Sequence, residues 1–134
     1  MKQLFLTAAI AIFVVNCSNS DDTSSTSQQN NPVTTQYFHP PAWIQGSWKV
    51  GNTSYYKFTN DDFIYVMNGT SYKAILTQTV SNGQTAKVDE TITDTDYKFI
   101  ITAGASSGTY KFKKLSTSQI QWLNGVNNTI LDKE

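Results

Sequence analysis

A pattern of three residues recurs four times in this 134-residue chain and constrains its fold more than any other feature. In each copy a tyrosine is followed by a lysine and then by an apolar residue. The four copies are Tyr56-Lys57-Phe58, Tyr72-Lys73-Ala74, Tyr97-Lys98-Phe99 and Tyr110-Lys111-Phe112. On an extended strand, alternate side chains point to opposite faces. The pattern therefore predicts a sheet with one dry face, which carries the rings, and one wet face, which carries the lysines.

Turn-forming residues divide the region after residue 37 into short segments. Asn68-Gly69 and Asn124-Gly125 lie between alternating runs and are strong hairpin signals. We expect eight strands, at Gly46–Val50, Tyr55–Thr59, Phe63–Met67, Tyr72–Val80, Val88–Thr93, Tyr97–Thr102, Thr109–Leu115 and Gln119–Leu123. A ninth run, Thr129–Asp132, would close or cap the sheet. No segment predicts a useful amphipathic helix, and Tyr37–Ile44 predicts at most one 3₁₀ turn.

Eight consecutive short strands predict an antiparallel meander. A meander of this length loses its exposed edges when it closes into a barrel. The interior of an eight-stranded barrel is just wide enough to be filled by side chains or to hold one small ligand. We therefore predict an all-β fold for residues 37–134, a small eight-stranded antiparallel β-barrel.

The residues expected inside this barrel are also the candidate ligand-binding residues. They are Trp48, Tyr56, Phe58, Tyr72, Tyr97, Phe99, Tyr110, Phe112 and Trp122, with Leu76 and Ile101 in the same inward set. One interpretation is a cavity for a small apolar ligand, with tyrosine hydroxyls as its few polar groups. The other is a packed core whose hydroxyls stay wet at the barrel ends. Strands of five to seven residues leave few layers for a void, which favours the packed core.

Composition excludes several classes of function. The chain has no arginine, and ten lysines balance ten acids, whereas nucleic-acid-binding proteins usually carry an Arg-rich basic stripe. A single cysteine excludes an internal disulfide, and a single histidine, His39, excludes most histidine-based metal sites and triads. His39 has no acid or nucleophile near it in the sequence. We expect a monomer without nucleic acid, without a cofactor and without enzymatic activity.

The acidic residues do not change that expectation. Asp89-Glu90 with Asp94 and Asp96 could offer oxygen ligands to calcium, but the spacing fits no known loop, and a solvated hairpin rim is the preferred interpretation. Every acid lies in a turn or in the tail, so no glycosidase pair is expected. The lysines of the outer face would discourage edge pairing.

The first residues predict export. Met1-Lys2 is followed by an apolar stretch from Leu4 to Val15, interrupted only by Thr7. As a helix, this stretch would span about 18 Å, whereas the hydrocarbon core of a bilayer is roughly 30 Å thick. Residues 1–16 therefore predict a signal peptide and not a membrane span.

The stretch ends in Val14-Val15-Asn16-Cys17, which resembles the lipobox of bacterial lipoproteins, in the relaxed form of Bacteroidetes-type members. The resemblance implies cleavage before Cys17 and acylation of Cys17, whose several acyl chains would anchor the protein stably. The expected location is the outer membrane, at its periplasmic face or at the cell surface. Residues 17–36 are expected to form a disordered polar tether. Its pair Asp21-Asp22 is either a surface-export signal of the Bacteroidetes type or part of a solvated linker.

The segment from Pro41 to Trp48, with its Gly46-Ser47-Trp48 motif, resembles the entrance of a lipocalin-like domain. Tyr56-x-Phe58-x-x-Asp61 and Tyr110-x-Phe112-x-x-Leu115 are similar to strands of small Bacteroidetes lipocalin-like lipoproteins. The resemblance covers most of residues 41–134 and implies a calycin-type barrel. It places Trp48 at the closed end under a basic residue, usually Arg, for which only a lysine could serve here. The implied function is a membrane-anchored binding module for a small apolar ligand.

A second group of residues is similar to membrane-bound lysozyme inhibitors. It consists of Ser106-Ser107-Gly108-Thr109-Tyr110 and Trp122-x-Asn124-Gly125. In that family a serine and a later lysine enter the lysozyme cleft, but Asn124 stands at the position of the lysine and the supporting cysteines are absent. This resemblance implies the alternative function, a filled-barrel interaction protein. Such a protein would act through its loops as an inhibitor or accessory subunit of an envelope complex.

Overall fold

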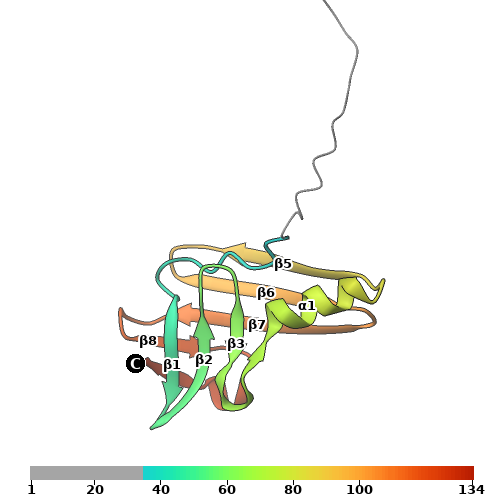
Figure 1. The fold of residues 1–134 in the computed structure, drawn as a ribbon. Helices are drawn as coiled ribbons and strands as arrows, with labels where there is room; N and C mark the ends of the chain where they lie inside the picture. The colour runs from blue at the N-terminus through green and yellow to red at the C-terminus, as the bar shows by residue number, and fades with distance from the viewer. Residues whose placement is uncertain (1–34) are drawn as a thin grey trace, which may run out of the picture. The chain divides into compact units, whose positions relative to one another are not determined.

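A computed structural model describes residues 35–134 as a mostly-β domain. Nine antiparallel strands form one meander sheet that curls through 275° into an open half-barrel (Figure 1). The strands are β1 Gly46–Val50, β2 Thr53–Phe58, β3 Phe63–Tyr65, β4 Thr70–Ser71, β5 Ala86–Ile92, β6 Asp96–Ala103, β7 Ser106–Lys114, β8 Gln119–Trp122 and β9 Ile130–Lys133. The helix α1 spans Tyr72–Ser81, and two 3₁₀ turns are η1 Val66–Asn68 and η2 Val126–Asn128.

The expected signal peptide, Cys17 and the tether as far as residue 34 lie outside the described residues. At the end of the expected tether, the Gln36 amide donates hydrogen bonds to the carbonyls of Phe38 and Asn60. Within residues 35–134, no helix has the length and apolar character needed to cross a bilayer.

The order of strands in the sheet is β4-β3-β2-β1-β9-β8-β7-β6-β5. The expected ninth run forms β9, which joins the two parts of the sheet: Lys133 pairs with Trp48 of β1, and Leu131 pairs with Ile120 of β8. In Figure 1, β1 to β3 cross β5 to β7 at a steep angle. No ladder joins the edge strands β4 and β5. The predicted closure of the barrel is therefore wrong, and the sheet stays open at this side.

Residues 72–80 form most of helix α1, so the strand predicted at Tyr72–Val80 and the predicted absence of a useful helix are both wrong. Ser71 is the N-cap, and its hydroxyl accepts a hydrogen bond from the amide of Ala74 at 3.0 Å. Leu76 and Thr79 are the buried residues of the helix, and their spacing is helical. The helix contacts β3, β5 and β6 and lies along the open side of the sheet.

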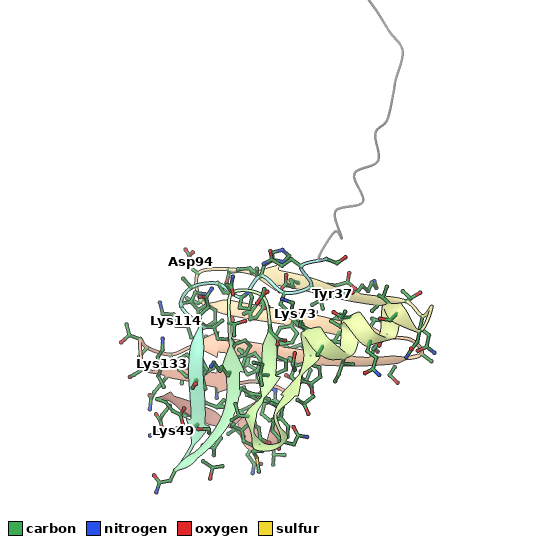
Figure 2. All side chains as sticks on the ribbon, viewed as in Figure 1. Tyr37, Lys49, Lys73, Asp94, Lys114 and Lys133 are labelled. Carbon is green, nitrogen blue, oxygen red and sulfur yellow. The ribbon has the colours of Figure 1, made fainter. Side chains whose placement is uncertain are left out.

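The predicted alternation of rings and lysines is confirmed in the strands. Tyr56 and Phe58 are buried on either side of the exposed Lys57, and Tyr97 and Phe99 flank the exposed Lys98 in the same way. Charged groups of the turns also point to solvent; Asp94, at the β5–β6 turn, extends away from the sheet in Figure 2.

Trp48 of the Gly46-Ser47-Trp48 motif is fully buried. Its indole N–H donates to the carbonyl of Ile44 at 2.6 Å. The ammonium of Lys133 lies 5.4 Å from the centre of the Trp48 ring, within range of a cation–π contact. The turn before the motif is closed by a hydrogen bond from Ile44 N–H to the carbonyl of Pro41 at 3.0 Å.

Candidate functional site

The structure brings the predicted interior residues together. Trp48, Tyr56, Phe58, Tyr97, Phe99 and Phe112 are buried, while Tyr72, Tyr110 and Trp122 are half-buried and packed against them. Leu76 and Ile101 are buried as well. The inward face predicted from the sequence is thus the inward face of the sheet.

This interior is filled with aromatic rings. Phe63 lies near its centre, with ring centroids 5.0 Å from Phe58, 5.1 Å from Phe99 and 4.9 Å from Tyr110. Phe63 and Phe38, both fully buried, were missing from the predicted set. Rings at these separations are in direct contact. The packing matches the filled-core interpretation, and a binding site has to be sought at the openings or on the outside.

A mainly apolar hollow lies at the open side, between α1 and the strands β6 and β7. It has a volume of about 150 Å³ and is lined by Tyr72, Ile75, Ile101, Ala103, Ser106, Ser107, Gly108 and Tyr110. An apolar cavity of about this size holds one benzene ring, and sites for drug-sized ligands are usually larger. The hollow therefore has room for one ring or for the end of an acyl chain.

Two tyrosine hydroxyls supply the polar group of this hollow. Tyr72 Oη and Tyr110 Oη are 2.8 Å apart. One hydroxyl donates to the other, so the hydroxyl that accepts still has its own proton to donate. Burial, together with the hydrogen bond that Tyr110 shares with Tyr72, raises the pKa of Tyr110 above its usual value, so Tyr110 stays neutral at neutral pH. The pair offers an uncharged donor to a ligand with one acceptor atom.

A second polar cluster holds the segment before β1 against β5 and β6. Glu90 accepts hydrogen bonds from the His39 backbone N–H at 2.9 Å and from the Tyr97 hydroxyl at 2.5 Å. Its other oxygen lies 2.8 Å from His39 Nδ1. His39 has no acid near it in the sequence, but the fold brings Glu90, 51 residues further along the chain, into contact with it. Burial, together with the hydrogen bond to Glu90, raises the pKa of Tyr97.

Three of the remaining sequence candidates, Asp89, Asp96 and Asn124, have structural partners. Asp89 forms an ion pair with Lys87 at 2.7 Å, and the Asp96 carboxylate accepts a hydrogen bond from the Thr95 hydroxyl at 2.7 Å. The Asn124 amide, at the position where the lysozyme inhibitors have lysine, binds the backbone of β7 instead. Within residues 35–134, no three His, Cys, Asp or Glu side chains lie close enough together to hold a metal ion.

Comparisons of this chain with protein-family models, with curated proteins and with solved structures found no match. A function has to be argued from the site geometry and from the sequence.

One end of the half-barrel is poor in charged residues, although the Glu134 carboxylate reaches it and accepts a hydrogen bond from the Ser54 hydroxyl. Three loops meet there, residues 50–56, 64–72 and 121–131, and none of them contains a Lys, Arg, His, Asp or Glu. We call this surface the uncharged end. Apolar side chains are exposed on it, with Met67 at 58% and Val126 at 78%. Beneath them, Tyr55 packs against Tyr65 and Trp122, with ring centroids 5.2 Å and 6.1 Å away. This surface was not among the predicted sites, although the absence of charged residues from these three segments is visible in the sequence.

Proposed function

We propose that this protein is a lipid-anchored, lipocalin-like binding module of the outer envelope. Its ligand is a small apolar molecule, or the apolar end of a larger one, held in the hollow beside α1. The observation that carries this proposal is the Tyr72–Tyr110 hydroxyl pair in an otherwise mainly apolar hollow. Such a combination, with apolar walls and a few orienting polar groups, is typical of small-molecule sites.

Two further observations support the proposal. The interior is filled, and the open side, where Ile75 is 38% exposed, offers an accessible apolar surface near the core. The Lys133 ammonium over the ring of Trp48 has the arrangement that the lipocalin-like resemblance implies, with lysine in place of arginine. The anchor rests on the lipobox resemblance at Cys17.

The binding site is tested by filling the hollow. The lipoprotein is extracted from its own membranes in neutral detergent, and native mass spectrometry measures any co-purified small molecule. We expect Ala103→Phe to lose that molecule, because its ring occupies the hollow. Ala105→Phe, in the exposed β6–β7 turn, is the matched control and retains the molecule.

The hydroxyl pair is tested with phenol as the probe. Tyr110→Phe removes one hydrogen bond, worth about 1 kcal/mol, so phenol should bind about fivefold more weakly. The proposal fails if the wild type carries no ligand and phenol shows no saturable binding. The anchor is tested separately, because Cys17→Ser should move the protein from the membrane fraction to the soluble fraction.

The uncharged end favours a second candidate function, that of an interaction protein. The cores of protein interfaces are depleted in charge and enriched in Tyr, Trp and Met, as this end is. Its partner would be an envelope protein with an equally uncharged, apolar surface. A Met67→Glu, Val126→Glu variant should fold normally but fail to retain any partner that co-purifies with the wild type. Unchanged retention would exclude this surface.

A further inference from the structure

Two lysines face each other on the outer side of the sheet. Lys98 of β6 and Lys111 of β7 are direct partners in the antiparallel register, and both are exposed. Directly opposite side chains have their Cβ atoms about 4.5–5.5 Å apart, and like charges in such a pair destabilise the sheet. The arrangement therefore has an electrostatic cost unless something compensates the two positive charges.

No side chain compensates them. Within residues 35–134, the lysines in ion pairs are Lys73, with Asp61, and Lys87, with Asp89; no carboxylate oxygen lies within 4.0 Å of Lys98 or Lys111. Asp96, at the start of β6, directs its carboxylate to the hydroxyls of Thr95 and Thr93, at 2.7 Å and 3.4 Å. On β5, the residue opposite Lys98 is the neutral Thr91.

The two lysines line a groove of about 310 Å³, together with Thr91, Asp96 and Leu123 among others. One wall of this groove is fixed by hydrogen bonds. Leu123 N–H donates to the carbonyl of Lys111 at 2.8 Å, and the Asn124 side chain accepts from the Lys111 N–H at 2.8 Å. The groove is thus a shaped surface, with two uncompensated ammonium groups on adjacent strands.

We infer that this groove binds a doubly charged oxyanion of the phosphate monoester class between Lys98 and Lys111. Lysine ammonium groups bind phosphate as point charges with three donors each. An anion between them adds two attractions that offset the repulsion between the two ammonium groups. The groove is larger than a phosphate group, so the hydroxyl of Thr91 and the side chain of Leu123 would contact the rest of the molecule. This site shares no lining residue with the hollow beside α1 and does not depend on the proposed function.

The test uses the full lipoprotein in neutral detergent micelles, followed by NMR of its backbone amides. Inorganic phosphate is titrated at constant ionic strength against chloride. We expect saturable shifts at the amides of Thr91, Lys98 and Lys111. Lys98→Gln and Lys111→Gln should each weaken phosphate binding by up to about fivefold, since an exposed charge pair is worth up to about 1 kcal/mol. Both variants should fold, because each removes a repulsion.

Lys57→Gln is the matched control. Lys57 is also an exposed lysine between two buried rings, but its partners across the sheet are Ser47 and Ile64. The inference is overturned if phosphate causes no saturable shift, or if Lys57→Gln weakens binding as much as Lys98→Gln. Glycerol 3-phosphate and micelles containing phosphatidic acid then distinguish a soluble ester from a lipid headgroup. Either source upholds the site.

Discussion

Replacement of Phe99 by alanine is the most direct test of the filled interior. Phe99 is fully buried on β6. Its ring centroid lies 5.7 Å from Phe38, 5.1 Å from Phe63, 5.2 Å from Tyr110 and 6.1 Å from Phe112. Removal of this ring leaves a cavity, because its four aromatic neighbours cannot all move inward to fill the space.

The expected cost follows from two contributions. Burial of a phenylalanine side chain contributes about 1.5–3 kcal/mol, and a favourable aromatic pair adds about 0.5–1.5 kcal/mol. Together with the residual cavity, these contributions place Phe99→Ala near the upper end of the usual range, at about 4 kcal/mol. A domain of this size has a total stability of about 5–15 kcal/mol. The variant should therefore lose between about a quarter and four fifths of its stability.

Urea denaturation followed by tryptophan fluorescence measures this loss. With a slope of about 1–1.5 kcal/mol per molar urea, the midpoint should fall by about 3 M. Lys98→Ala, the adjacent outward residue, is the control and should change stability by no more than about 0.5 kcal/mol. A loss below about 1.5 kcal/mol for Phe99→Ala would refute the filled interior, because it would mean that the ring borders open space.

Two further predictions use the same assay. Gly125→Ala should lower the free energy of unfolding by about 1–3 kcal/mol, because the added Cβ would lie 2.3 Å from Trp122 Cε3. In the matched control Gly108→Ala the Cβ lies at an ordinary 3.6 Å from Tyr110, and the loss should be less than about 1 kcal/mol. Equal losses in the two variants would contradict the clash with Trp122. Stability should also fall as pH rises above 10, by up to about 1.4 kcal/mol per pH unit for each of Tyr56, Tyr97 and Tyr110. The reason is that burial raises the pKa of these tyrosines in the folded state, so the unfolded chain binds fewer protons than the folded one. Tyr97→Phe should reduce this pH dependence, and stability that does not change up to about pH 11 would contradict the burial of these hydroxyls.

The sequence was sufficient for most of the strands because their signal is local. Alternation of a ring and a lysine can be read within three residues, and Lys57 and Lys98 are exposed between buried rings as the pattern requires. The turn residues then gave the strand boundaries to within a few positions, and both ends of β1, Gly46 and Val50, were predicted correctly. The lead-in to β1, with the buried Phe38, was missed because its partners come from distant strands.

Helix α1 shows where local reasoning failed. Tyr72-Lys73-Ala74 has the same pattern as the strand triplets, and Leu76 continues both an alternating and a helical period. The decisive contacts come from Asp62, whose carboxylate accepts from the Ser71 hydroxyl at 2.6 Å and from the Lys73 N–H at 2.9 Å. These contacts fix the first turn of the helix from outside the segment. No pattern within residues 72–80 contains that information.

The candidate site exists because residues 72–80 form a helix and not a strand. A closed barrel would need a ladder between β4 and β5, but β4 consists only of Thr70 and Ser71, and the helix begins at Tyr72. A helix packed along the open side cannot fill the space as evenly as a strand would, and it leaves the hollow between Ile75 and Ile101. It also brings Tyr72 within hydrogen-bonding distance of Tyr110, a residue of β7. If residues 72–80 had continued as a strand, the rings of both tyrosines would have joined the inward face, and neither the hollow nor its hydroxyl pair would exist.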